Sequence, residues 1–177
     1  MVSAFVASSP EQAAARSATL ALLDETVDPL GRQAGGHVTG SALVVDALGE
    51  RVLVLWHRKL RIWVQPGGHV EGDGDLARSA RREAVEETGI DGLRLVAPVP
   101  VDLDVHRVAP PDAEPHAHHD VRFVVVAPPG AEPVANEEAD RFRWLTGDEV
   151  ETDPGCDASL RRLTRLGLAL ARGCSQA

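Results

Sequence analysis

The segment of residues 67–90, GGHVEGDGDLARSARREAVEETGI, constrains the fold of this chain more than any other feature. Asp75 is a residue type that caps helix N-termini, and Gly89 is suited to end a helix because glycine adopts a left-handed conformation without strain. A helix is therefore predicted over Leu76–Thr88, preceded by a glycine- and aspartate-rich loop.

Three glutamates, Glu83, Glu86 and Glu87, recur at i, i+3 and i+4 in this helix and so project from one face. Like charges on one face repel unless a positive charge lies between them, and hard cations such as Mg²⁺ or Mn²⁺ prefer carboxylate oxygens. The glycines before the helix, Gly67 and Gly68, allow backbone to approach a phosphate or offer a carbonyl to a metal. The simpler alternative is a solvated acidic face.

The rest of the chain alternates between strand-like and helix-like patterns, which predicts an α/β domain. The expected helices are Pro10–Leu30 and Leu160–Ala171, besides the one above, and the expected strands are His37–Val45, Arg51–Trp56, Leu93–Val105 interrupted by Pro98 and Pro100, His116–Ala127 and Arg141–Leu145. The first two strands are expected to form a hairpin. Residues 1–36 are interpreted as a helical extension packed on a single domain of residues 37–177.

The segment resembles the Nudix box, G-x5-E-x7-R-E-U-x-E-E-x-G-U, in which U is aliphatic. The matching residues are Gly68, Arg82, Glu83, Ala84, Glu86, Glu87, Gly89 and Ile90, without insertion. The resemblance implies a Nudix-type α/β/α sandwich with a mixed sheet and the box loop-helix. It also implies a Mg²⁺-dependent pyrophosphohydrolase that cleaves a diphosphate linkage in a nucleoside diphosphate derivative or a similar small organic pyrophosphate.

Roles for the box residues follow from the same resemblance. Glu83 and Glu87 are expected to be the primary Mg²⁺ ligands, Glu86 a further ligand, and the Gly67 carbonyl a part of the inner shell. Arg82 is expected to orient a glutamate rather than to touch substrate. The implied reaction is attack of water on phosphorus, in which positioning and electrostatics dominate.

One box position departs from the pattern, because its first glutamate falls on Gly74. In the family that glutamate lies at the start of the helix and braces the arginine. Asp73 and Asp75 flank the gap, and either is a candidate substitute. The departure leaves open a degenerate Nudix domain that binds a nucleotide as a sensor or partner module without hydrolysing it.

A general base is expected from Glu83 itself or from a later loop. In several Nudix enzymes a glutamate shortly before the last strand serves as base, and Glu137 and Glu138 lie in that region, in VANEEADRFRW. Glu138 is the preferred candidate, against the alternative that both are solvated loop charges.

The segment PHAHHDVRF places His116, His118, Asp120 and Arg122 on one face of a predicted strand. Three interpretations stay open: a polar wall of the substrate pocket, a transition-metal site, since imidazole suits such metals, or an exposed strand end. His118, Asp120 and Arg122 are taken as substrate-binding candidates.

Further substrate-binding candidates flank the box. Gly68 and His69 lie in the box loop, and His37 begins the first strand. Arg58 and Lys59 precede the box in a basic segment suited to grip phosphates. For these side chains a solvent-exposed role is the alternative.

Composition excludes several classes of function. The formal net charge of −9 disfavours non-specific binding to a nucleic-acid polymer, which requires clustered basic residues. The opening MVSAFVASSP lacks the basic and apolar regions of a signal peptide, and no apolar run reaches membrane-spanning length. We therefore expect a cytoplasmic protein that acts on a small molecule away from the membrane. A homodimer is compatible with the sequence, which does not identify the substrate.

Overall fold

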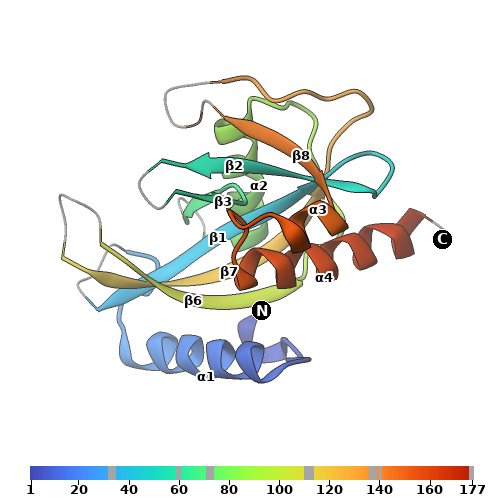
Figure 1. The fold of residues 1–177 in the computed structure, drawn as a ribbon. Coiled ribbons are helices and arrows are strands. Elements are labelled where there is room, and N and C mark those ends of the chain that lie inside the picture. The colour runs from blue at the N-terminus through green and yellow to red at the C-terminus, as the bar shows by residue number, and fades with distance from the viewer. Residues whose placement is uncertain are drawn as a thin grey trace.

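The computed structural model describes residues 1–31, 35–58, 61–70, 74–109, 114–135, 139 and 141–175, with the last two by backbone only. A short 3-10 helix, η1 (Val2–Ala4), precedes the helices α1 (Pro10–Glu25), α2 (Leu76–Thr88), α3 (Gly147–Thr152) and α4 (Ala158–Ser175). The strands, shown with the helices in Figure 1, are β1 (Gly36–Val45), β2 (Arg51–His57), β3 (Ile62–Val64), β4 (Gly67–His69), β5 (Arg94–Leu95), β6 (Asp102–Val108), β7 (His116–Val126) and β8 (Phe142–Thr146).

The strands form one mixed sheet centred on β1 and β7. These two run parallel over ten residue pairs, from Gly36 beside Ala117 to Val45 beside Val126, and the other pairings among the described strands are antiparallel. The order is β3-β2-β1-β7-β5, while β4 pairs with β1, β6 with β7 and β8 with β2. The predicted hairpin of β1 and β2 is confirmed.

Helices cover both faces of the sheet. On one face, α2 contributes Ala80 and Ala84 to a core with Val44 and Phe123. On the other, α4 packs Leu163 and its neighbours against the alternate side chains of the same strands. Figure 1 shows α2 and α4 on opposite sides of β1 and β7. The predicted α/β/α architecture is therefore confirmed. Because helices cover both faces of the sheet, the central strand β1 is buried along its whole length.

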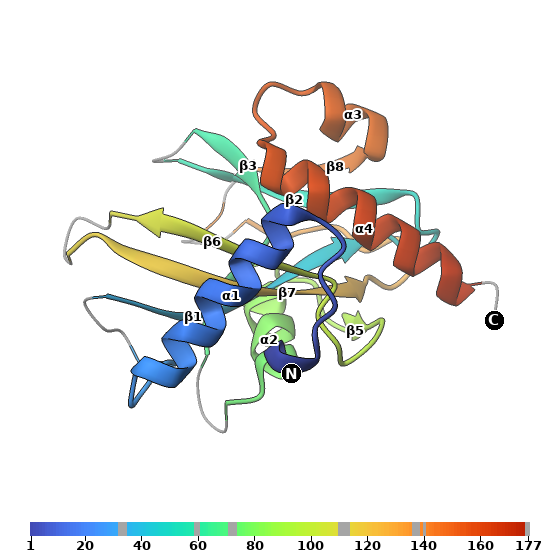
Figure 2. The same ribbon diagram turned by 90° about the horizontal axis from the view of Figure 1, so that it is seen from below.

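Helix α1 packs against β6 and crosses it obliquely, as the view from below in Figure 2 shows. Its start agrees with the sequence, since Ser9 caps it by accepting a hydrogen bond from the Gln12 amide, with Pro10 at the first helical position. It ends at Glu25 instead of Leu30, because Thr26 takes an extended conformation. The division of the chain at residue 36 stays a prediction.

Three other boundaries differ from expectation. The strand predicted over Leu93–Val105 is interrupted around Pro98 and Pro100 as expected, because proline has no amide hydrogen for a strand ladder, but its second part, β6, runs on to Val108. Gly67–His69, expected as loop, pairs with β1 as β4. Helix α3 was not predicted, although Thr146 and Glu149 form a capping box that is visible in the sequence.

Within the described parts of the chain, none of the helices combines the length and the apolar character needed to cross a membrane.

Candidate active site

Local interactions set the position of α2 over the sheet. Asp75 caps its first turn by accepting a hydrogen bond from the Arg78 amide at 3.1 Å. Gly89 ends it in the left-handed conformation, with φ of 65°. Gly40 in β1 allows close approach, since a side-chain Cβ there would lie 3.2 Å from the Leu76 carbonyl oxygen. The apolar face of α2 is thus held on the sheet, and its glutamates lie at the border of that contact.

Two of the glutamates lie against β4. The Gly67 amide donates a hydrogen bond to Oε2 of Glu87 at 2.9 Å. A Cβ placed on Gly68 would lie only 2.4 Å from Oε2 of Glu83. Glycine at position 68 therefore leaves the space that the Glu83 carboxylate occupies, and the structure brings the box glycines and glutamates together.

Arg82 connects the glutamates to β4 as a positioning residue. Its Nη2 donates to Oε1 of Glu83 at 2.8 Å and to the His69 carbonyl oxygen at 3.1 Å. Its Nη1 donates to Oε2 of Glu86 at 2.8 Å. The guanidinium group is thus engaged with protein acceptors, which agrees with an orienting role.

The donor set fits a hard divalent cation. Glu83, Glu86 and Glu87 present carboxylate oxygens from adjacent turns of one helix, and Arg82 supplies one positive charge against three negative ones. The Glu83 side chain is 15% exposed and that of Glu86 is 51% exposed, so the site is partly desolvated at Glu83 and open to water at Glu86. Mg²⁺ binds in such settings through one or two carboxylates and keeps several waters.

Gly74 occupies the box position of the missing glutamate in a conformation that disfavours a side chain. Its φ is +75°, and an added Cβ would lie 3.2 Å from a methyl group of Leu30. Of the two flanking acidic residues, Asp75 serves as the N-cap, and Asp73 lies outside the described residues. Arg82 is held by the other partners described above.

Histidine rings gather where β1, β4 and β7 adjoin, and one of them, His69, lies on the strand that Arg82 contacts. The ring centroid of the buried His37 lies 4.9 Å from that of His69, 5.0 Å from that of His116 and 4.8 Å from that of His118. Burial, together with the neighbouring rings of His37, His106, His116 and His69, lowers the pKa of His118 to about 3. The His118 imidazole is therefore neutral at physiological pH.

The structure places Asp120 and Arg122 away from any open surface. Each is 3% exposed, and Nε of Arg122 donates to Oδ2 of Asp120 at 2.9 Å. Arg122 also pairs with Asp102 and Asp104 of β6. Although burial alone would lower the pKa of Arg122, these three carboxylates raise it, so the side chain stays charged. Because both groups are committed to a buried ion-pair network, we withdraw them as substrate contacts.

The other predicted residues lie as follows. Arg58 is exposed in the turn after β2, whereas Lys59, Glu137 and Glu138 fall outside the described residues.

His106 was not predicted to join the histidines, yet its ring lies 5.6 Å from that of His118. Alternation along residues 102–108 would have placed His106 with Asp102 and Asp104 on one face, but pairing of β6 with β7 could not be derived from that pattern.

A second feature that was missed is a stack of aromatic and basic side chains at the β2–β3 edge. The rings of Trp56 and Trp63 lie 5.0 Å apart in an edge-on arrangement, and the Arg141 guanidinium lies 4.9 Å from the Trp56 ring. Arg143 lies over Trp63 at 5.6 Å. Trp63 is buried, so it serves packing, while the half-buried Trp56 keeps part of its surface in solvent.

The family model described as NUDIX domain matches residues 37–166. No curated protein matches the chain. A NUDIX family hydrolase from Clostridium perfringens is similar in structure, with a TM-score of 0.58 and 18% identity, covering 77% of this chain and 98% of its own. A C. elegans Ap4A hydrolase in a binary complex gives 0.59 and 17%, with the same two coverages. The E. coli dihydroneopterin triphosphate pyrophosphohydrolase gives 0.57 and 19%, covering 75% of this chain and 94% of its own.

Proposed function

The chain belongs to the NUDIX domain family and is a Nudix pyrophosphohydrolase, and we propose that it uses Mg²⁺, or Mn²⁺ in its place, to cleave a diphosphate linkage in a nucleoside diphosphate derivative or a similar small organic pyrophosphate. The observation that supports this most directly is the convergence of Glu83 and Glu87 on the backbone of β4. A solvated acidic helix face would not require a glycine at position 68, where an added Cβ would collide with the Glu83 carboxylate.

Glu83, Glu86 and Glu87 would hold the cation, with the Gly67 carbonyl as a further oxygen donor. When bound, the ion would neutralise charge on phosphoryl oxygens and make water a better nucleophile. Arg82 keeps two of the carboxylates in place before substrate arrives, which lowers the cost of organising the site. The Gly67 amide does the same for Glu87.

The remaining assignments rest on the family resemblance. Glu138 is proposed as the general base, and Arg58 and Lys59 as groups that contact substrate phosphates. His69 and His118 are proposed to line the substrate side, whereas the fully buried His37 contacts both of their rings. The named activities of the structural neighbours guide only the choice of test compounds, because at identities below 20% they share the fold alone.

The test is a panel of phosphoanhydrides incubated with the purified protein and Mg²⁺ or Mn²⁺. The panel contains Ap4A, dihydroneopterin triphosphate, nucleoside triphosphates and nucleoside diphosphate sugars, and release of phosphate, pyrophosphate and nucleoside monophosphate is measured. Metal-dependent turnover of at least one compound is expected. Binding of a nucleotide without turnover of any compound would support the degenerate, non-hydrolytic domain instead.

Glu87→Gln tests the assignment of the helix. Losing one carboxylate should lower turnover by roughly 100-fold or more, because the electrostatic support of the cation is lost. Glu50→Gln is the matched control, since Glu50 is exposed in the turn between β1 and β2. Equal turnover in the two variants would remove Glu87 from the proposed site.

A further inference from the structure

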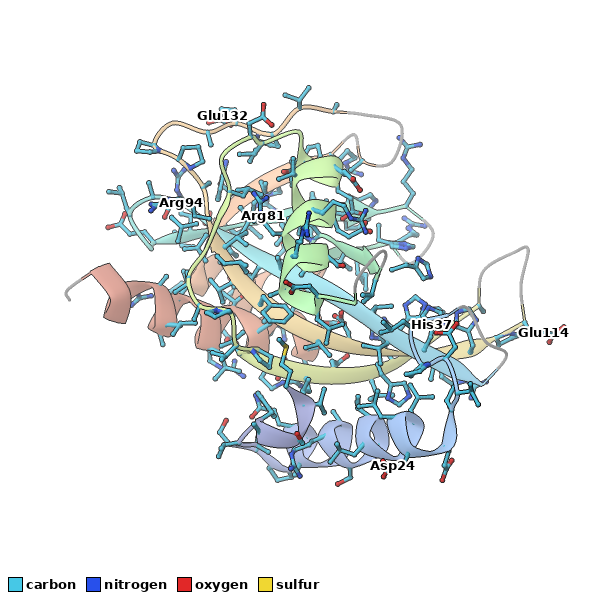
Figure 3. All side chains as sticks on the ribbon, turned by 180° about the vertical axis from the view of Figure 1, so that it is seen from behind. Asp24, His37, Arg81, Arg94, Glu114 and Glu132 are labelled. Carbon is cyan, nitrogen blue, oxygen red and sulfur yellow. The ribbon has the colours of Figure 1, made fainter. Side chains whose placement is uncertain are left out.

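Five of the seven histidines in the sequence take part in one set of ring contacts. The parallel pairing of β1 and β7 sets His37 directly beside His118, and His116 lies two residues earlier on the same face of β7. Figure 3 labels His37 on β1, where that strand runs alongside β7. The cluster thus depends on sheet register and is built from rigid strands.

Three of these rings offer ligand atoms to a common point. One nitrogen each from His37, His116 and His118 lies within 4.8 Å of the other two. A tetrahedral Zn²⁺ with bonds of about 2.0–2.1 Å needs nitrogens about 3.3 Å apart. Small side-chain rotations that move the two half-buried rings of β7 by about an ångström close this difference, without movement of the strands.

We propose that His37, His116 and His118 form a binding site for a divalent transition-metal ion of the Zn²⁺ class. The fourth position of the ion is left to water or to His69, whose ring centroid lies 4.9 Å from that of His37. Imidazole nitrogens suit zinc, copper and nickel, whereas Mg²⁺ selects oxygen ligands, so the histidine and glutamate sites differ in the ion that they select.

The electrostatics of the cluster agree with this assignment. A metal ligand must be a neutral imidazole, and the rings of His37, His116 and His118 are all in contact with one another. Several imidazoles in contact would repel one another if protonated. Sharing a cation is a way for such rings to lie together without bearing protons.

Zn²⁺ titration of the metal-free protein tests the site, with Mg²⁺ in large excess so that the glutamates are saturated. Isothermal titration calorimetry is expected to give one equivalent of tight Zn²⁺ binding. Co²⁺ is expected to give the intense visible absorption of a tetrahedral ion, which an octahedral oxygen site does not produce. His116→Ala and His118→Ala should each weaken Zn²⁺ binding by at least roughly 10-fold. The control is His57→Ala, which changes a histidine of β2 that is not a proposed ligand, and this variant should bind Zn²⁺ as wild type does.

A second readout needs no variant and so is independent of folding defects. Side-chain nitrogen NMR of wild-type protein should show Zn²⁺-dependent shifts at His37, His116 and His118, while the His57 and His119 signals stay unchanged. Absence of Zn²⁺ binding beyond the Mg²⁺-saturated sites, or shifts confined to other histidines, would overturn the proposal. Because the assay measures Zn²⁺ alone, its result is independent of hydrolytic activity.

Discussion

The two adjacent glycines of β4, Gly67 and Gly68, face different neighbours, so replacing each of them by alanine should have a different effect. A Cβ on Gly68 would meet the end of a flexible carboxylate, Oε2 of Glu83 at 2.4 Å. Gly68→Ala should therefore change the free energy of unfolding by less than about 1 kcal/mol, yet lower turnover about 10-fold or more by displacing a metal ligand. Steady-state kinetics and urea unfolding of the same preparation measure both quantities.

Gly67→Ala should instead lower the stability of the protein more than its turnover. Its Cβ would lie 2.3 Å from Cβ and 2.8 Å from Cα of Ser41 in the paired strand, so backbone has to move. A loss of about 1–3 kcal/mol of stability is expected, as for other overpacked positions. If Gly68→Ala were the less stable protein and Gly67→Ala the less active one, the assignment of the two glycines would be wrong.

Restoring the missing box glutamate is a third change at the residue scale. The φ of +75° at Gly74 costs an L-residue about 1–2 kcal/mol, and the Leu30 methyl group limits the space for Cβ. Gly74→Glu should therefore lower stability by about that amount and leave turnover no higher than that of wild type. Faster turnover with unchanged stability would show that the position retains the family's bracing role.

At the scale of elements, buried polar contacts join α1 to the sheet. The side chain of Gln12, 1% exposed, donates from Nε2 to Oδ1 of Asp102 at 2.8 Å. Its Oε1 accepts from the amide of Ser8 at 2.8 Å. Gln12→Ala leaves these groups without their partner and should cost about 1–3 kcal/mol. Thermal unfolding by circular dichroism measures this, with Gln12→Glu expected to destabilise further by placing a carboxylate against Asp102.

The elements that the sequence predicts well are those set by neighbours along the chain. The helix ends at Ser9, Asp75 and Gly89 are set by contacts within four residues along the chain. The roles of these residues could therefore be predicted from residue type and spacing. The position of β4 depends on pairing with β1, almost thirty residues earlier, and glycines there were interpreted as loop.

The same division explains the site. The spacing of the glutamates on α2 is local and was predicted, and the structure brings them to the box glycines. Asp120 and Arg122 were correctly placed on one face of their strand, but their partners on β6 come from a separate segment. A one-strand pattern could not distinguish a pocket wall from a buried ion pair.

At the scale of the whole molecule, one ion-pair network joins the sheet, through β6 and β7, to the helix α4 that covers one of its faces. Arg122 of β7 contacts Asp102 and Asp104 of β6, and Arg162 of α4 contacts the same two carboxylates. The Asp102 side chain is fully buried. Removing one partner from such a network leaves an uncompensated charge and costs about 3–5 kcal/mol, so Arg122→Met should destabilise the protein more than Gln12→Ala does. Urea unfolding of the two variants compares these losses directly.

Asp104 makes this network sensitive to acid. Burial alone would raise the pKa of this carboxyl, but the hydrogen bond from His106 and the positive charges of Arg122 and Arg162 hold it well below its usual value of 3.8. A carboxyl whose pKa is depressed by folding stabilises the protein above its unfolded pKa, and that contribution is lost as pH falls through and below 3.8. Wild type should therefore begin to lose stability as pH falls below about 5, and the loss should be steepest below about 3.8.

Asp104→Asn isolates this contribution. The variant should be clearly less stable than wild type at about pH 6, and the difference should shrink as pH falls towards about 3, because the wild-type carboxylate takes up a proton in the unfolded state first. Urea unfolding at each pH measures the difference. Asp91→Asn, at an exposed position between α2 and β5, is the control and should stay within about 0.5 kcal/mol of wild type at about pH 6. If the stability difference between Asp104→Asn and wild type grew on acidification, the acid sensitivity of the fold would have to come from groups other than the ion-pair network between β6, β7 and α4.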